Sequence, residues 1–239
     1  MGPVPAGSAV PWTGGPLVFV DDLDTPLLST DDHHHLARVR RLHPGDPLVL
    51  SDGRGSWRTA AFQGDSPADL GPVVATAEPK PLLGVAFALV KGQKPELVVQ
   101  KLTELGIDRV VPFVAERSVV RWDQGKADAA LGRWQKVARE AAMQSRRSWL
   151  PEVEPLVSYA AVAARSGACR ADDGGGPLTL DLPLVLIGPE GGWSAAERSV
   201  ELPSVSLGAG VLRAETAAIA AGAVLTALRS ALVRPAEGG

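Results

Sequence analysis

Two glycine-rich segments near the carboxyl end hold the residues best suited to bind a small ligand. They are residues 188–192 (GPEGG) and 207–210 (LGAG), and each lies between an apolar run and a predicted helix. Glycine adopts positive φ without strain and lets a ligand approach the main chain closely. The pair therefore predicts a site at which backbone groups from two turns face one small ligand. Taken alone, the first segment is also typical of a plain strand-to-helix loop.

Three side chains able to take part in a reaction follow the second segment directly. Arg213, Glu215 and Thr216 stand at the start of the last predicted helix. The first turn of a helix offers free N–H groups and the positive end of the helix dipole, which favour anionic or carbonyl groups. An acid and a hydroxyl at this position also cap a helix, and the two roles are compatible.

Several common chemistries lack their sequence motifs in this chain. It has no Gly-x-x-x-x-Gly-Lys-Ser/Thr loop, no Gly-x-Gly-x-x-Gly opening a helix early in its α/β part, and no Gly-x-Ser-x-Gly elbow. Histidines 33–35 are consecutive, so they point in different directions on a helix, and His43 has no cysteine beside it. We therefore expect no metal site.

The composition is that of an ordinary globular protein, with 45% hydrophobic and 21% charged residues. The single cysteine, Cys169, cannot form an intramolecular disulfide, which predicts a reducing, cytoplasmic location. The amino terminus lacks a basic segment followed by an apolar run, so we expect no signal peptide. No apolar stretch reaches the roughly 18 residues needed to cross a membrane.

Positive charge is concentrated in one segment, although the net charge is −3. A local excess of cations can neutralise several phosphates of a nucleic acid, but it can equally be a solvated helix face. The acids within residues 117–147 are Asp123, Asp128 and Glu140, and the cations are Arg117, Arg121, Lys126, Arg133, Lys136, Arg139, Arg146 and Arg147.

The pattern of apolar residues changes near residues 78–81 (EPKP), where we expect a domain boundary. Before it, short apolar runs alternate with Gly-Asp and Asp-Gly turns, which predicts a small β-barrel interrupted by one helix. The strands are expected at 17–20, 47–50 and 57–62, and the helix from 29–32 through Val39.

After residue 81, strands and helices alternate, as in an α/β sheet with parallel strands. Ser194 and Glu197 form a capping box, in which each side chain satisfies a free N–H group at a helix start. We expect strands at 82–90, 110–114, 184–187 and 205–207, helices at 95–105, 126–147 and 215–232, and a polar linker through 172–176.

The chain resembles the bacterial 16S ribosomal RNA (uracil-N3) methyltransferase E family of the SPOUT superfamily. No single matching segment is decisive, but together they span nearly the whole chain in the right order. They are His35-Leu36, residues 39–45, Lys91-Gly92-Gln93-Lys94, 101–106 (KLTELG), 111–113 (VPF), 116–118 (ERS), 140–147 (EAAMQSRR) and the two glycine segments.

The resemblance implies a PUA-like β-barrel RNA-binding domain over 1–78 and a SPOUT α/β domain over 79–239 with a C-terminal trefoil knot. It further implies S-adenosylmethionine (SAM) as methyl donor, 16S rRNA of the small ribosomal subunit as partner, and a homodimer with active sites at the subunit interface. The cofactor residues carried over to this chain are Ile187, Gly188, Pro189, Gly191, Leu207, Gly208, Leu212 and Ala217.

The chemistry implied by the resemblance assigns roles to the remaining residues. Uracil N3 loses a proton before it attacks, and charge then spreads onto O2 and O4, so we expect Arg213 to stabilise that charge. Glu215 or Thr216 would orient the base or pass on the proton, with bulk water as another acceptor. The residues expected to contact RNA are His35, Arg38, Arg41, Arg117, Gln144, Arg146 and Arg147, with Gln144, Arg147 and Glu140 on one helix face.

The chain departs from the family pattern in the second glycine segment, where the family often carries a basic residue at the position of Gly210.

Three alternatives to this function remain open from the sequence. They are a SPOUT enzyme acting on another RNA, a non-catalytic RNA-binding protein, and an enzyme that uses 188–192 as an anion nest for a phosphorylated metabolite.

Overall fold

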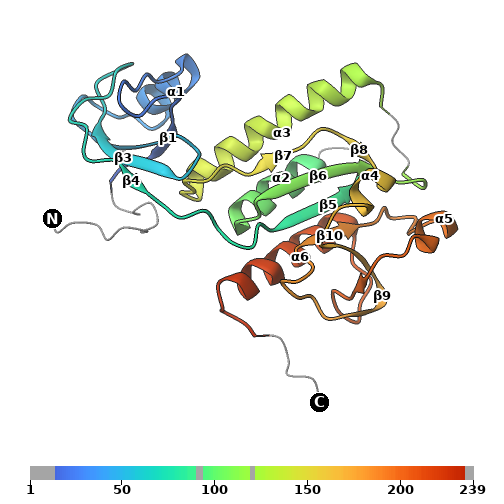
Figure 1. The fold of residues 1–239 in the computed structure, drawn as a ribbon. Coiled ribbons are helices and arrows are strands. Elements are labelled where there is room, and N and C mark those ends of the chain that lie inside the picture. Colours follow the sequence, from blue (N-terminus) through green and yellow to red (C-terminus); the bar gives the residue numbers. More distant parts are fainter. Residues whose placement is uncertain (1–13, 90–93, 119–121, 235–239) are drawn as a thin grey trace. The chain divides into compact units, whose positions relative to one another are not determined.

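The computed structural model describes residues 14–89, 94–118 and 122–234. The chain divides into two compact units, one formed by Met1–Glu78 with Ala142–Leu150 and the other by Pro79–Ala141 with Pro151–Gly239 (Figure 1). None of the described helices is both long and apolar enough to cross a membrane. The predicted motif residues Lys91, Gly92 and Gln93, as well as Val90 and Arg121, lie outside the described residues.

The first unit contains a four-stranded sheet in the order β1-β2-β3-β4. The first pair is parallel and the other two are antiparallel, and among the described residues no pairing joins β1 to β4 to close the expected barrel. The predicted strands are confirmed as β1 (Leu17–Phe19), β2 (Pro47–Ser51) and β3 (Ser56–Ala61), and β4 (Val74–Ala75) is added.

The predicted helix of the first unit is also confirmed. Ser29 caps α1 (Thr30–His34) by accepting a hydrogen bond from the backbone N–H of Asp32, and the helix continues as a π-helical segment, His35–Val39. Leu36 faces the core of this unit, where it packs with Leu48 and Leu50 of β2. A polar amino-terminal cap followed by one apolar face is what the sequence pattern predicted.

Residues 142–150 belong to the first unit, although they begin with the last three residues of a helix, Gln124–Gln144, that lies mostly in the second. Ala142 is fully buried against Phe19 of β1 and Trp57 of β3. The backbone N–H of Gly55 donates to the carbonyl of Ser148 at 2.9 Å, and a Cβ at Gly55 would lie 2.4 Å from the Trp149 ring. The glycine is therefore needed for this close approach.

The second unit is built on a parallel sheet in the order β11-β9-β10-β5-β6-β7, with β8 also paired to β6 (Figure 1). Buried parallel strands are continuous apolar runs, as β5 and β10 are. The strands are β5 (Gly84–Ala88), β6 (Arg109–Val114), β7 (Glu152–Val153), β8 (Val157–Ser158), β9 (Ala168–Gly176), β10 (Leu184–Ile187) and β11 (Ser204–Val205). The helices are α2 (Lys94–Leu105), α3 (Gln124–Gln144), α4 (Tyr159–Ala163), α5 (Ala195–Ser199) and α6 (Ala214–Arg229).

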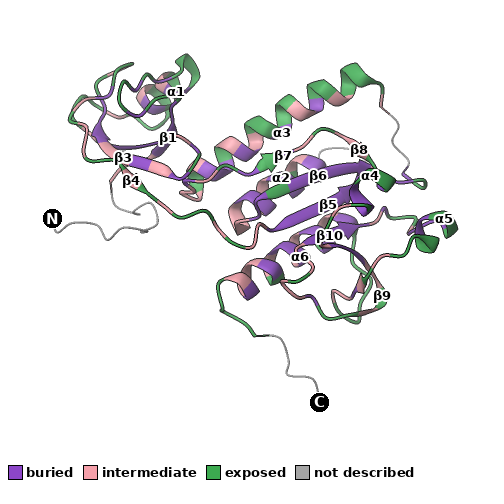
Figure 2. Cartoon of the chain, viewed as in Figure 1, coloured by how far each residue is buried: buried purple, intermediate pink, exposed green. Residues whose placement is uncertain are grey.

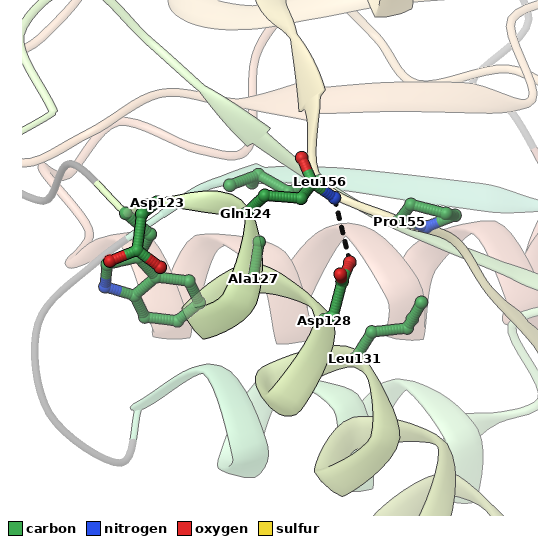
Figure 3. Close-up of a pocket in the computed structure, with 8 residues that line it drawn as sticks. Asp123, Gln124, Ala127, Asp128, Leu131, Pro155 and Leu156 are labelled. Atoms are coloured by element: carbon green, nitrogen blue, oxygen red, sulfur yellow. Dashed lines mark hydrogen bonds between the residues drawn. The ribbon is translucent and has the colours of Figure 1, made fainter.

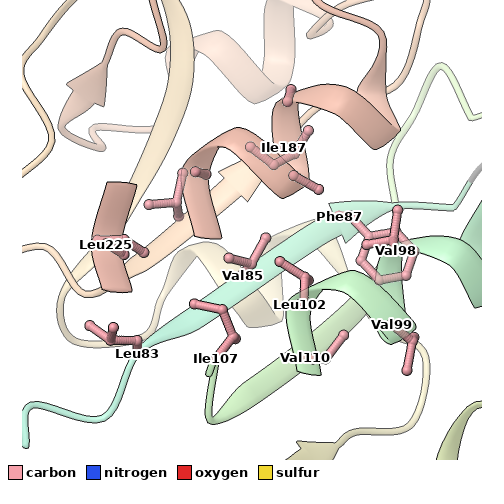
Figure 4. Close-up of a cluster of buried hydrophobic side chains, with 14 of the residues drawn as sticks. Leu83, Val85, Phe87, Val98, Val99, Leu102, Ile107, Val110, Ile187 and Leu225 are labelled. Carbon is pink, nitrogen blue, oxygen red and sulfur yellow. The ribbon is translucent and has the colours of Figure 1, made fainter. Parts of the chain in front are cut away.

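Each face of this sheet has its own core, because side chains alternate along a strand. On one face, Val85 and Phe87 of β5 pack against α2, α3 and α6 in the larger of two clusters of buried hydrophobic side chains. Figure 4 shows part of this cluster. Ala86 and Ala88 point to the opposite face, toward α4 and Trp193. Figure 2 accordingly shows β5 buried along its length and β6 buried between its two ends.

Two sequence expectations for this part of the chain were wrong. Residues 172–176 are not a linker but the end of β9, which pairs with β10 on one side and β11 on the other. Residues 168–170 of β9 pair with β10, whereas Gly176 pairs with Val205 of β11, and a polar, glycine-rich sequence does not reveal such a distant partner. The long helix ends at Gln144 instead of residue 147, and Arg146 has the left-handed φ of 58° that often terminates a helix.

Candidate functional site

A cavity of about 330 Å³ opens where the chain leaves β10 and β11. In open α/β sheets, ligands bind beyond the carboxyl ends of the strands. Both predicted glycine segments line this cavity and so face the same space. The lining residues are Ala171, Asp172, Asp173, Ile187, Gly188, Pro189, Glu190, Gly192, Trp193, Arg198, Ser206, Leu207, Gly208, Ala209, Gly210, Val211, Leu212, Ala214 and Ala217.

The first glycine segment, residues 188–192, forms a turn (the first turn) that is held in place by Trp193. A Cβ at Gly188 would lie 3.0 Å from the indole ring, so only glycine fits there without displacement. The indole Nε1 donates to the carbonyl of Ala171 at 2.9 Å, and the ring stacks on Phe113 with an interplanar angle of 3°. The turn is therefore tied to β9 and β6.

The helix after the first turn begins with the predicted capping box. The Ser194 hydroxyl accepts from the Glu197 N–H at 3.1 Å, and Glu197 Oε2 accepts from the Ser194 N–H at 2.8 Å. The other carboxylate oxygen, Oε1, accepts from the backbone N–H of Glu116 at 2.9 Å. Because Glu197 is buried, these bonds fix the turn against the loop that follows β6.

The second glycine segment, residues 207–210, forms a turn (the second turn) that has few packing contacts. Gly208 has φ of +126°, and no described atom beyond chain neighbours lies within 4 Å of a Cβ built there or at Gly210. The Ser206 hydroxyl bonds to Gly208 at 3.3 Å, and the Val211 side chain is fully exposed. This turn forms the open wall of the cavity.

Carboxylates line the cavity on the side of β9. Arg198 Nη1 donates to Asp172 Oδ2 at 2.5 Å, and Arg170 Nε lies 3.6 Å from the same oxygen. Asp172 is thus balanced by two guanidinium groups, whereas the exposed Asp173 presents its carboxylate at the rim. This side of the cavity suits a ligand with hydroxyl or cationic groups.

The start of α6 carries the three residues predicted to act in the reaction. Arg213 is the N-cap residue, exposed, and makes no side-chain capping bond within the described structure. Glu215 lies 3.3 Å from Lys94 Nζ, and its pKa is held below the usual value by a hydrogen bond from its own backbone N–H and by Lys94. Arg213, Glu215 and Thr216 do not line the cavity but sit between Leu212 and Ala217, which do.

Of the predicted cofactor residues, Ile187, Gly188, Pro189, Leu207, Gly208, Leu212 and Ala217 line the cavity, while Gly191 lies beside it. The Gly191 carbonyl accepts a hydrogen bond from Arg117 Nη1 at 3.1 Å. The structure therefore brings one predicted RNA residue against the first turn, within the second unit.

The other predicted RNA residues all belong to the first unit. His35, Arg38 and Arg41 are exposed and lie in or just after the π-helical segment. Gln144, Arg146 and Arg147 join the same unit through the segment 142–150. Glu140 and Gln144 lie one turn apart on α3, but Arg147 lies beyond the end of the helix and does not extend the expected shared face.

Two of these arginines have a left-handed backbone. Arg41 has φ of 57° and Arg146 has φ of 58°, in a region where a non-glycine residue costs about 1 kcal/mol. Arg146 Nη2 donates to the Gly15 carbonyl, and burial together with the nearby Arg40 lowers the pKa of its guanidinium. At both positions glycine would be less strained than arginine.

A family model described as an RNA methyltransferase domain matches residues 77–226, more than half of the chain, and an RNA methyltransferase PUA domain matches residues 28–67. A ribosomal RNA small subunit methyltransferase E of Mycobacterium tuberculosis is 33% identical over an alignment of 239 positions, and this alignment covers 87% of this chain and 90% of the relative.

This chain belongs to the ribosomal RNA small subunit methyltransferase E family. Two solved structures support the assignment. A ribosomal RNA small subunit methyltransferase E of Neisseria gonorrhoeae bound to SAM has a TM-score of 0.77 and 28% identity, covering 89% of this chain and 97% of the other. A methyltransferase of Legionella pneumophila in complex with SAM has a TM-score of 0.76 and 27% identity, covering 88% and 96%.

Sequence reasoning missed several residues that this member of the methyltransferase E family places at the cavity. Asp172, Asp173 and Arg198 are not among the residues expected from the sequence, and the first two lie in the segment 172–176, which was expected to be a linker. Trp193, directly after the first glycine segment, is not among them either. Lys94 belonged to a matching segment, but nothing in the sequence connected it to Glu190 and Glu215.

A second, smaller cavity of about 90 Å³ lies at the start of α3 (Figure 3). Trp122, Asp128 and Leu156 are among its lining residues, and Gln124 Nε2 donates to Asp128 Oδ1 at 2.8 Å across its wall. None of the predicted site residues lines it. Among the residues that the structure describes, no group of three or more His, Cys, Asp or Glu side chains could hold a metal ion.

Proposed function

We propose that this protein transfers a methyl group from SAM to N3 of a uridine in small-subunit (16S) ribosomal RNA. Its membership in the methyltransferase E family supports SAM-dependent methylation of this RNA. The observation that carries the proposal is the cavity in which both glycine turns meet beside the start of α6. The choice of N3 of a uridine rests on the resemblance.

The cavity fits SAM in size and chemistry. Its volume lies at the lower end of the range of about 300–1,000 Å³ for small-ligand pockets. The glycine positions expose main-chain groups for adenine, and the apolar side chains of Leu207, Leu212 and Ala217 suit a flat ring. The carboxylates of Asp172 and Asp173 suit the ribose hydroxyls and the positive charge of SAM. Ile187, Gly188, Pro189, Gly191 and Gly208 complete the proposed cofactor site.

When bound, SAM supplies a methyl group already activated on a sulfonium sulfur. The residues of the chain then act mainly by positioning the acceptor nitrogen in line with that group. We propose that Arg213 stabilises the negative charge on uracil O2 and O4 once N3 has lost its proton. Glu215 and Thr216, on the same helix turn, orient the base or pass on the proton, with bulk water as the final acceptor.

RNA contacts are proposed on both units. Arg117 lies beside the first turn, close to the cofactor cavity. His35, Arg38, Arg41, Gln144, Arg146 and Arg147 offer donors and positive charge on the first unit, which suits recognition of RNA shape and phosphates. These contacts must supply the few kcal/mol needed to extrude the target base.

We further propose the finer features that the resemblance implies. They are a SPOUT fold with a C-terminal trefoil knot, a homodimer whose active sites lie at the interface, and a cytoplasmic location. After β11, at one edge of the sheet, the chain returns to α6, which packs on the central strands. This path is compatible with a knot. A closed barrel in the first unit stays a prediction.

The first test is methyl transfer from labelled SAM to small ribosomal subunits and to rRNA lacking the modification, followed by nucleoside analysis. We expect 3-methyluridine. Measurable SAM binding without incorporation into any RNA would contradict the proposal and favour another acceptor or a non-catalytic RNA-binding protein.

The same assay tests the role of Arg213. Because the loss of one charge-stabilising group typically costs about 10²–10³-fold in kcat, we expect Arg213→Ala to lose turnover on that scale. SAM affinity, measured in parallel by calorimetry, should change little. Arg109→Ala is the matched control, since Arg109 is half-exposed and pairs with Glu152 away from the cavity. Unchanged turnover in Arg213→Ala would contradict this role.

A further inference from the structure

Lys94 joins three elements at one end of the cofactor cavity. It is the first residue of α2, and its Nζ lies 3.2 Å from Glu190 Oε1 and 3.3 Å from Glu215 Oε1. Glu190 belongs to the first glycine turn and lines the cavity, whereas Glu215 belongs to the first turn of α6. One ammonium group therefore bridges the cavity wall and the helix that carries the proposed reactive residues.

The two carboxylates differ in burial. The side chain of Glu190 is 47% exposed and that of Glu215 is 13% exposed. Glu215 Oε1 faces Lys94, but its Oε2 is buried and has no hydrogen-bond partner within the described residues. A buried carboxylate oxygen without a donor is costly, so the Lys94 ammonium 3.3 Å from the other oxygen is what balances the charge of Glu215.

We propose that Lys94 is a positioning residue, which holds Glu215, and with it the start of α6, against the first turn so that Arg213 is placed beside the acceptor nucleotide. This inference rests on the proposed function and deepens it. Glu190 holds Lys94 from the opposite side, so that the first turn and the start of α6 are tied together. Without Lys94, two neighbouring carboxylates would repel each other across this gap.

The charge balance supports the arrangement. The pKa of Lys94 is raised, chiefly by its hydrogen bond to Glu190 and further by Glu215, so that the ammonium stays charged. The pKa of Glu215 is lowered, chiefly by its own backbone N–H and further by Lys94 and Arg213. Glu215 therefore remains an anion and keeps its ion pair with Lys94.

The test compares Lys94→Met and Lys94→Arg with a matched control on the same helix. Lys101→Met removes a Lys–Glu ion pair of similar exposure, since Lys101 Nζ lies 2.8 Å from Glu104 Oε2 and its side chain is 39% exposed, against 36% for Lys94. For each variant, kcat and KM are measured with unmodified small subunits, and the Kd for SAM by calorimetry.

We expect Lys94→Met to lower kcat by about 10²-fold, the loss typical of a misplaced reactive geometry, with the Kd for SAM within about threefold of wild type. Lys94→Arg should recover most of the loss, and Lys101→Met should behave as wild type. Because Lys94 acts through Glu215, adding Lys94→Met to Glu215→Gln should cause little further loss.

Three results would overturn the inference while leaving the proposed function in place. The first is a kcat of Lys94→Met equal to that of Lys101→Met. The second is a double variant whose loss of kcat equals the product of the losses of Lys94→Met and Glu215→Gln. The third is a parallel loss of SAM affinity of more than about tenfold in Lys94→Met, which would mean that Lys94 only supports the cavity. A wild-type protein that binds SAM but methylates no RNA would overturn the proposed function, and this inference with it.

Discussion

The two glycine-rich turns face the same cavity but are held in opposite ways. The first is fixed by the Trp193 ring above Gly188 and by the bonds of Glu197 to two backbone N–H groups. The second has open space around Gly208 and Gly210 and a fully exposed Val211. One side of the cavity is thus preformed, and the other is free to adjust to a ligand.

The difference has a physical cause in the neighbours of each turn. The first turn follows β10, a central strand, so Trp193 packs on Phe113 of β6 and Tyr159 of α4. The second follows β11, the edge strand, where fewer elements lie near it. Residues with few buried contacts open at low free energy, and binding loops are commonly drawn from them.

The largest expected effect comes from the cap of the first turn. Glu197→Ala removes a buried carboxylate and leaves the N–H groups of Ser194 and Glu116 without their acceptor, so we expect the free energy of unfolding to fall by about 3 kcal/mol. Ser206→Ala in the second turn should cost about 0.5 kcal/mol or less. Urea denaturation measures both, and equal losses would contradict the comparison.

A smaller effect is expected from the glycine beneath Trp193. Gly188→Ala places a Cβ 3.0 Å from the indole, so we expect a loss of about 2 kcal/mol in unfolding free energy and weaker SAM binding. Gly210→Ala is the matched control, because its Cβ meets open space and should change the unfolding free energy by less than about 0.5 kcal/mol. If the two variants behaved alike, Trp193 would not be what holds the first turn.

The smallest effect is expected at Val211. Its side chain is fully exposed, so Val211→Ser should alter the unfolding free energy of the protein by less than about 0.5 kcal/mol. Thermal unfolding at several protein concentrations checks this. A loss above about 1 kcal/mol that depends on concentration would mean that a second copy covers this turn in solution, which would sharpen the comparison in favour of the proposed homodimer.

Much of the fold was predictable because the signals are local. The buried strands β5 and β10 are short apolar runs, and the capping box at Ser194 and Glu197 requires only residues three positions apart. The glycine turns were equally visible, since each follows such a strand. The predicted cofactor residues gather at one cavity for this reason.

The failures lie where distant partners decide the structure. The polar segment 172–176 continues β9, whose earlier residues pair with β10, and its Gly176 pairs with Val205 of β11. The long helix was predicted three residues too far, since its end is set by the segment 142–150, which packs with the first unit. Neither polarity nor periodicity carries this information.

The sequence by itself determined the strands, helices and turns that have local signals, and which family the chain resembles, because these depend on neighbouring residues and on motif order. Only the tertiary structure decided that Asp172 and Arg198 reach the cavity, that Arg146 joins the first unit, and that Lys94 meets Glu190 from 96 residues away. Such meetings depend on the order of strands in the sheet, and that order follows from long-range packing rather than from local pattern.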